Sequence, residues 1–215
     1  MKNNLIGISG RIGSGKDTVG NIINYLCWKN SVEKGIADPQ TYTIKDFIDG
    51  RGRETFEIKK FADKLKQRVA LTWGIDRIKL EDRGFKNSII PQLGITWRKI
   101  MQLEGEKMRE INKDYWVNAL FSDYSDFYNS MFSVRNGYKE PKNKWIITDV
   151  RFPNEVKAIK DRGGIVIRVN RKTDELSNHE SETALDNAKF DYIIDNNSDI
   201  RSLIEKVKIW ILYNI

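Results

Sequence analysis

The chain has 215 residues and a hydrophobic content of 40%, which suits one domain of ordinary size with a full core. Its 37 lysine and arginine residues outnumber 30 acidic residues, so the formal net charge of +7 favours phosphate-bearing partners, nucleotide or nucleic acid alike. No apolar run approaches the ~20 residues that span a bilayer. Because the chain also enters a strand almost at once, we expect no signal peptide, no membrane partner and a cytoplasmic protein. The single cysteine, Cys27, lies on an apolar stretch and is expected in the core.

The apolar pattern predicts strands that alternate with helices along the chain. Strands are expected over residues 5–9, 55–61, 145–150, 165–169 and 190–194. Helices are expected over residues 16–29, 62–73, 96–111, 114–132, 153–162 and 200–213, with irregular segments at 31–53 and 74–95. This order is typical of the α/β class, in which helices cover both faces of a parallel sheet and ligands bind beyond the carboxyl ends of the strands. We expect a single domain over residues 1–215.

The first predicted strand leads into a glycine-rich turn and then directly into a helix. The turn reads Gly10-Arg11-Ile12-Gly13-Ser14-Gly15-Lys16-Asp17-Thr18. Glycines allow successive backbone N–H groups to converge on phosphate oxygens, the helix start adds its dipole, and the lysine reaches the terminal phosphates. The sequence therefore predicts a P-loop, the other reading being a tight turn between strand and helix. The residues expected to bind the nucleotide are Gly13, Ser14, Gly15, Lys16, Asp17 and Thr18.

Asp17 stands where the usual P-loop pattern has a serine or threonine that holds Mg²⁺. Many nucleoside monophosphate kinases shift this hydroxyl by one position, so Thr18 is the expected hydroxyl near the metal. Two interpretations of Asp17 stay open. It holds a metal-bound water, or it is simply a carboxylate favourably placed at a helix N-terminus.

A second cluster lies at the end of the strand expected over 145–150. The apolar run ends in Asp149, and Arg151 follows two positions later, just before Pro153, which fits a first helical turn. P-loop enzymes use an acid at such a strand end to hold Mg²⁺ or its waters, and an arginine there can reach a transferring phosphoryl group. Beside a P-loop we favour this reading over a plain salt bridge and turn.

The helix expected over 96–111 has one narrow polar face. At ~100° per residue, this face holds Arg98, Gln102, Gly105 and Arg109, and the opposite side holds Ile100, Met101, Leu103, Met108 and Ile111, which can pack on the core. Arginine offers a fixed fork of donors for phosphate. Gly105 costs ~1 kcal/mol relative to alanine in a helix interior, which close approach of a ligand would explain. The alternative is a solvated face with a tolerated glycine.

Three further segments are weaker candidates. Lys64, at the start of the helix expected over 62–73, can meet an acceptor phosphate. The aromatic and basic stretch 123–144 is either a lid over the donor or a solvated excursion. Residues 177–182, with the only histidine, His179, and residues 196–198 are either helix caps or lie near the base of the donor.

These motifs together resemble one family. In chain order they read Gly13-Ser14-Gly15-Lys16-Asp17-Thr18, Phe61-Ala62-Asp63-Lys64-Leu65-Lys66, Gln102 through Gly105 to Arg109, Thr148-Asp149-Val150-Arg151-Phe152-Pro153-Asn154-Glu155 and His179-Glu180-Ser181-Glu182. The order is similar to that of the deoxynucleoside monophosphate kinases of tailed bacteriophages, from about residue 5 to residue 198. One departure is Glu104-Gly105-Glu106, where related sequences often have Gly-Thr-Glu, so a threonine is missing from the expected acceptor site.

The resemblance implies a P-loop NTPase three-layer α/β fold of the nucleoside monophosphate kinase type, with a mostly parallel central sheet. It also implies ATP as phosphate donor, Mg²⁺, and a deoxynucleoside monophosphate as acceptor, bound by a helical region at about 62–132. If the chain is encoded by a phage, its compartment is the host cytoplasm. The sequence leaves open whether the chain forms a homodimer.

These residues suggest catalysis by positioning and by neutralisation of charge. Lys16 and the loop amides would hold the donor phosphates, Arg151 and Arg11 would steady the transferring group, and Thr18 and Asp149 would organise Mg²⁺, directly or through water. The residues expected to contact the acceptor or the substrates in general are Lys64, Arg98, Gln102, Gly105, Arg109, Trp116 and Glu182. The alternatives are a kinase for another small phosphorylated acceptor, as in animal phosphomevalonate kinases, and a nucleic-acid-stimulated ATPase. Because the basic residues are scattered, we expect no stable nucleic-acid partner.

Overall fold

The computed structural model describes residues 3–36, 42–124, 143–172 and 180–214. It separates the chain into two compact units. Unit 1 comprises Met1–Lys59 and Ser125–Ile215, and unit 2 comprises Lys60–Tyr124. None of the helices in these described ranges is both long and apolar enough to cross a membrane.

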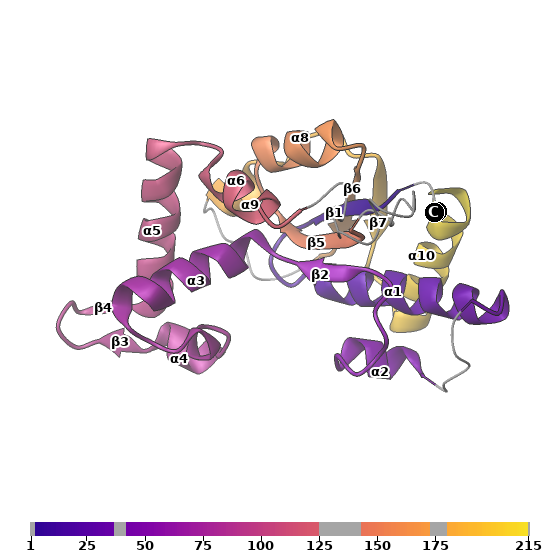
Figure 1. Ribbon diagram of the computed structural model, residues 1–215, viewed down its shortest axis with the longest axis horizontal. Coiled ribbons are helices and arrows are strands. Elements are labelled where there is room, and N and C mark those ends of the chain that lie inside the picture. Colours follow the sequence, from indigo (N-terminus) through magenta and orange to yellow (C-terminus); the bar gives the residue numbers. More distant parts are fainter. Residues whose placement is uncertain (1–2, 37–41, 125–142, 173–179, 215) are drawn as a thin grey trace, which may run out of the picture. The chain divides into compact units, whose positions relative to one another are not determined.

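Unit 1 is built on a five-stranded sheet in which every neighbouring pair of strands is parallel. Its strands are β1 (Leu5–Ser9), β2 (Glu57–Lys59), β5 (Trp145–Val150), β6 (Ile165–Asn170) and β7 (Tyr192–Asp195). Their spatial order is β2-β5-β1-β6-β7, so β1 lies at the centre (Figure 1). The predicted parallel α/β fold is confirmed.

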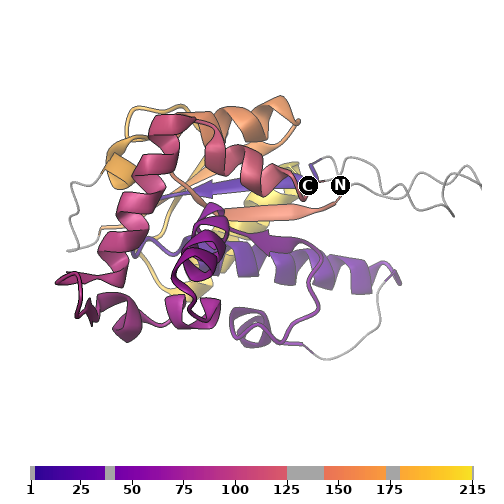
Figure 2. The same cartoon turned by 60° about the vertical axis from the view of Figure 1, so that its left-hand side comes forward.

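Helices cover both faces of this sheet. The long helices α1 (Lys16–Glu33) and α10 (Ile200–Asn214) lie on one face, and α8 (Pro153–Asp161) lies on the other (Figure 1, Figure 2). Alternation along β1 explains both contacts, because Ile6 and Ile8 join the core formed with α1 and α10. Gly7 points the other way, where a Cβ atom would lie only 2.7 Å from the Cδ1 atom of Ile159 on α8.

Cys27 on α1 is buried in this core, as predicted. Burial raises the pKa of its thiol to about 11, so the group stays protonated and packs as a small apolar side chain.

A buried asparagine ties α1 to the segment that leads into β2. The Asn24 side chain donates to the Phe56 carbonyl at 2.9 Å and accepts from the Phe56 and Thr55 N–H groups at 2.7 and 3.1 Å. Replacing Asn24 with alanine should lower the free energy of unfolding by ~3 kcal/mol, because these backbone groups lose buried partners. Denaturant unfolding measures this loss. The exposed Asn30→Ala on the same helix is the matched control, and equal stability of the two variants would contradict the expectation.

Unit 2 is mostly helical and has a core of its own. Its elements are α3 (Phe61–Trp73), η1 (Arg77–Leu80), α4 (Arg83–Asn87), β3 (Ile89–Ile90), β4 (Ile95–Thr96), α5 (Trp97–Ile111) and α6 (Tyr115–Phe121). Helix α3 packs against both α5 and α6. The fully buried members of the core include Val69 on α3 and Leu80 on η1.

Several predicted segments differ from the structure. Residues 74–95 were expected to be irregular, but they form two short helices and a β-hairpin, and the side chains of Asp76 and Asp82 cap these helices. Segment 31–53 contains a short helix, α2 (Ile44–Ile48). The helix expected over 114–132 ends at Phe121, and the strand expected over 55–61 pairs only over Glu57–Lys59. Such short elements carry too few apolar positions to show a period.

Candidate active site

The predicted catalytic groups of unit 1 gather at one edge of the sheet. In parallel strands the carboxyl ends meet at the same edge. The glycine-rich loop follows β1, Asp149 lies at the end of β5, and Asn196 directly follows β7. Residues far apart in the sequence are thereby brought to one place.

The loop after β1 has the backbone geometry that its glycines permit. Gly13 has φ 74° and Gly15 has φ 94°, a region that side chains with a Cβ rarely adopt. Gly15 precedes the first residue of α1. A Cβ at residue 15 would also lie 2.6 Å from the Asn196 side-chain nitrogen, so both conformation and space require glycine there.

Lys16 lies over this loop and is largely removed from water. Its ammonium group donates to the carbonyls of Gly10 at 2.7 Å and Arg11 at 2.8 Å. Burial, and then the charge of Arg151, lower the pKa of Lys16 to about 8, while Glu182, Asp17 and Asp149 act in the opposite direction. The lysine therefore sits among charged groups drawn from α1, β5 and the segments that follow β5 and β6.

Two carboxylates, Asp17 and Asp149, act electrostatically on Lys16 at the start of α1. Asp17, in the first turn of α1, accepts a 2.6 Å hydrogen bond from the Thr148 hydroxyl on β5. Asp149, the next residue along that strand, is buried with 7% exposure. Within the described part of the chain no group of three or more histidine, cysteine or acidic residues could hold a metal ion. Mg²⁺ nevertheless fits, because it commonly takes one or two carboxylates and completes its shell with water and phosphate oxygens.

Arg151 is held from two sides. Its guanidinium donates to Glu182 at 2.5 Å and to the Ser181 hydroxyl at 3.3 Å, and its backbone N–H donates to Glu155 at 2.6 Å. Burial, and then the charge of Asp149, raise the pKa of Glu155 to about 8. Glu155 also accepts from the Phe152 N–H, and so it fixes the backbone that carries Arg151. The sequence signal for Glu155 was its place in the first turn of a helix that begins with proline.

Glu182 lies in unit 1, against the glycine-rich loop. Its second carboxylate oxygen accepts a 2.7 Å hydrogen bond from the Ile12 N–H, and its side chain is only 8% exposed. The sequence pointed to Glu182 only as a substrate contact, and its bond to the loop was not foreseen.

Asn196 was also missed as a loop-binding residue. It is buried, and its side-chain N–H₂ donates to the Ser14 carbonyl at 2.9 Å. Residues 196–198 were expected to be a helix cap or a neighbour of the donor base, but the side chain that caps α10 is Asp199, which accepts from the Ser202 N–H. The only available signal for Asn196 was its position directly after a strand.

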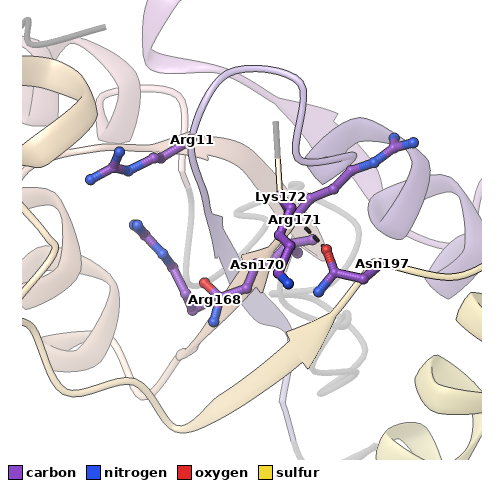
Figure 3. Close-up of a pocket in the computed structure, with 7 residues that line it drawn as sticks. Arg11, Arg168, Asn170, Arg171, Lys172 and Asn197 are labelled. Carbon is purple, nitrogen blue, oxygen red and sulfur yellow. Dashed lines mark hydrogen bonds between the residues drawn. The ribbon is translucent and has the colours of Figure 1, made fainter. Parts of the chain in front are cut away.

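A basic pocket of about 350 Å³ lies at the ends of β1, β6 and β7. It is lined by Arg11, Arg168, Val169, Asn170, Arg171, Lys172 and Asn197 (Figure 3). Arg11 and Arg168 both pair with Asp186, at 2.6 and 3.1 Å. The Asn197 oxygen accepts from the Lys172 N–H at 2.8 Å, which leaves its N–H₂ group as a donor. The lining is therefore rich in hydrogen-bond donors and suits a ligand rich in acceptors.

The predicted acceptor residues, except Glu182, all lie in unit 2. Arg98, Gln102 and Arg109 are half-buried on α5, and Arg98 donates to the Asn87 side chain at 2.9 Å. Lys64 on α3 pairs with Asp123 at 2.7 Å.

Gly105 and Trp116 are parts of the packing of unit 2. Gly105 is buried, and a Cβ there would make ordinary contacts at 3.5 Å with Leu65 on α3 and at 3.6 Å with the Arg109 guanidinium, so protein atoms surround the glycine. Trp116 is 5% exposed and its indole N–H donates to the Gly105 carbonyl at 3.1 Å. This burial does not support the prediction that Trp116 contacts a substrate.

The apolar side of α5 is displaced from the predicted one. Ile100 and Met108 are buried as expected, but Leu103 is 44% and Ile111 is 70% exposed. The buried arc runs through Ile100, Met108 and Gly105, because α3 packs over the glycine. Leu103 falls outside that arc, whereas Ile111 lies within it but is the last residue of the helix.

Two predicted segments lie largely outside the described residues. Of the proposed lid over 123–144, residues 125–142 are not described. Residues 173–179, which include His179, are not described either.

Comparison with known proteins decides the family. Residues 79–207, more than half of the chain, match the family model described as deoxynucleotide monophosphate kinase. The chain belongs to this family. It is therefore a kinase that transfers a phosphoryl group to a deoxynucleoside monophosphate. Membership does not favour a nucleic-acid-stimulated ATPase or a phosphomevalonate-like kinase.

A relative and two solved structures accompany this match to the deoxynucleotide monophosphate kinase family. The chain is 29% identical over 214 residues to a putative deoxynucleotide monophosphate kinase of Acanthamoeba polyphaga mimivirus, covering 94% of this chain and 93% of the relative. Dephospho-CoA kinase from Campylobacter jejuni aligns with 98% of this chain and 96% of its own, at a TM-score of 0.46 and 13% identity. TT1252 from Thermus thermophilus aligns over the whole of both chains, at a TM-score of 0.45 and 12% identity.

Proposed function

We propose that this kinase takes the terminal phosphoryl group of ATP, bound with Mg²⁺ at the glycine-rich loop, and transfers it to a deoxynucleoside monophosphate to give the diphosphate. The proposal rests mainly on the position of Lys16, Asp149 and Arg151 at one glycine-rich loop. The charges of Asp149 and Arg151 both act on the Lys16 ammonium group, which supports this position. The acceptor phosphate is already largely ionised, so transfer needs no strong base and depends on positioning and charge.

The loop would bind the donor phosphates. Backbone N–H groups from Gly15 to Thr18, at the start of α1, supply donors and a favourable dipole. Ser14 is buried, and its hydroxyl has no hydrogen-bond partner among the residues that the structure describes, so it can bind a phosphate oxygen. Lys16 and Arg151 would neutralise the charge that develops on the transferring group.

Asp149 and Thr18 would hold Mg²⁺, directly or through water, and the ion would supply charge neutralisation between the donor phosphates. The bond from Thr148 orients Asp17 toward β5, which supports a role for Asp17 in the outer shell of the same ion.

The nucleoside part of the donor would lie in the basic pocket. Arg11 reaches this pocket from the loop itself, and Arg171 and Lys172 line it from the end of β6. Arginine side chains can both stack on a base and bind phosphate or ribose oxygens, which fits a lining rich in donors. Arg11 would then contact the donor from this pocket.

The acceptor would be bound in unit 2. Arg98 and Arg109 offer guanidinium groups for its phosphate, Lys64 adds a third cation, and Gln102 can bind the base. The bacteriophage resemblance and the mimivirus relative support a viral enzyme, which would act in the cytoplasm of its host, with no stable nucleic-acid partner.

Asn196 offers a test of the donor site that leaves the chemistry untouched. Replacing it with alanine removes the hydrogen bond that fixes the Ser14 carbonyl, so the loop should lose its preorganised shape. We expect ATP affinity to fall about tenfold, the size of one buried hydrogen bond. Isothermal titration calorimetry measures the change, with the exposed Asn30→Ala as control. Unchanged affinity in a variant that melts like the wild type would remove Asn196 from the donor site.

A substrate panel tests the proposed function as a whole. ADP formation from ATP should depend on a deoxynucleoside monophosphate and on Mg²⁺, and the four common bases and their ribose counterparts establish selectivity. Phosphomevalonate and DNA serve as negative controls. Stimulation by either control, with none by any monophosphate, would overturn the proposal.

A further inference from the structure

Glu182 binds Arg151, which the proposed mechanism assigns to the transferring phosphoryl group, and a backbone N–H of the glycine-rich loop. One carboxylate oxygen accepts from the Ile12 N–H of the glycine-rich loop at 2.7 Å, and the other accepts from the Arg151 guanidinium at 2.5 Å. The charge of Glu182 also acts on the ammonium group of Lys16, which is proposed to bind the donor phosphates. The side chain of Glu182 is 8% exposed, which strengthens these interactions.

A carboxylate and a terminal phosphate cannot share this place. Both are anions that accept hydrogen bonds from the same kinds of donor, and the single proton of a backbone N–H serves one strong acceptor at a time. Two anions held a few ångströms apart in a poorly solvated site repel each other. A triphosphate whose terminal phosphate binds Lys16 and Arg151 must therefore displace the Glu182 carboxylate from Arg151.

We propose that Glu182 is an internal competitor of the terminal phosphate of the donor, and this rests on the proposed function of the glycine-rich loop as the ATP site. Binding of ATP moves the carboxylate away and frees Arg151 for the transferring group. After transfer the terminal phosphate is gone, so Glu182 returns to Ile12 and Arg151. The residue thereby discriminates against the triphosphate in binding, and it leaves the diphosphate product almost unaffected.

The test is the affinity of Glu182→Gln for MgATP and for MgADP, measured by isothermal titration calorimetry without acceptor. Removing the charge should tighten ATP binding about tenfold and change ADP binding less than threefold. Glu182→Asp keeps the charge but shortens its reach, so its ATP affinity should lie between those of the wild type and Glu182→Gln. The control is Glu180→Gln, an exposed neighbour on α9 (Glu180–Thr183), which should bind both nucleotides as the wild type does.

The other role for Glu182 is to hold Arg151 in its catalytic position. In that case Glu182→Gln would bind ATP with unchanged or weaker affinity and would have a lower kcat. This result would overturn the proposal that Glu182 competes with the terminal phosphate. ATP and ADP tightened by the same factor would also overturn it, because the effect would not be specific to the terminal phosphate. If the wild type itself binds no ATP, the proposed function fails first. If the wild type binds ATP but Glu182→Gln does not bind it more tightly, the proposed role of Glu182 fails and the proposed function stands.

Discussion

Replacing Lys16 with methionine should lower kcat/KM for phosphoryl transfer by about 10²–10³-fold or more and leave the fold intact, since one preorganised donor at a developing charge contributes this much. The ammonium group lies over the loop and bonds only to the carbonyls of Gly10 and Arg11 in its described contacts. Methionine keeps the aliphatic stem and removes the charge. Steady-state kinetics and thermal melting measure the two effects, and Lys29→Met, an exposed change on the same helix, is the control. Full activity in a folded Lys16→Met variant would contradict the mechanism.

The pKa of Lys16 adds a second readout to this variant. Because burial and Arg151 lower that pKa to about 8, the free protein loses the Lys16 charge as the pH rises through this value. ATP affinity of the wild type should therefore weaken between pH 7 and 9. In Lys16→Met the part of this pH dependence that comes from the loss of the Lys16 charge should be absent, so the affinity should fall less steeply between pH 7 and 9.

Replacing Asp149 with asparagine should lower kcat by about 10²–10³-fold and raise the Mg²⁺ concentration needed for half-maximal rate, because the buried carboxylate is the proposed anchor of the ion. Asparagine has nearly the same size, so packing at the end of β5 is preserved. Asp161→Asn, an exposed change on α8, is the control. An unchanged Mg²⁺ dependence would exclude Asp149 from the metal site, whatever the loss in rate.

The central strands and the glycine-rich loop could be predicted directly from the sequence. Strands β1 and β5 are buried on both faces, so they appear as unbroken apolar runs, and both were predicted with the correct bounds. Gly13 and Gly15 indicate a left-handed backbone conformation, and Pro153 indicates the start of α8. These signals are local, because each depends on one residue type and its chain neighbours.

The parts of the site that escaped prediction depend on contacts between distant segments. Asn196, just after β7, donates to the Ser14 carbonyl, which lies 182 residues earlier in the sequence. Glu182 accepts from the Ile12 N–H, 170 residues earlier. Neither asparagine nor glutamate shows by its type which backbone group it will bind. The burial of Trp116 was not foreseen for a related reason. An indole suits a ligand surface and a protein core equally well, and its sequence neighbours do not show that it will donate to the Gly105 carbonyl.

The most direct test of the account follows the labelled terminal phosphate of ATP in the presence of Mg²⁺ and a deoxynucleoside monophosphate. The account predicts that the label appears in the deoxynucleoside diphosphate, at a rate that Lys16→Met and Asp149→Asn abolish in parallel. Label found only in inorganic phosphate, at a rate independent of the monophosphate, would contradict it.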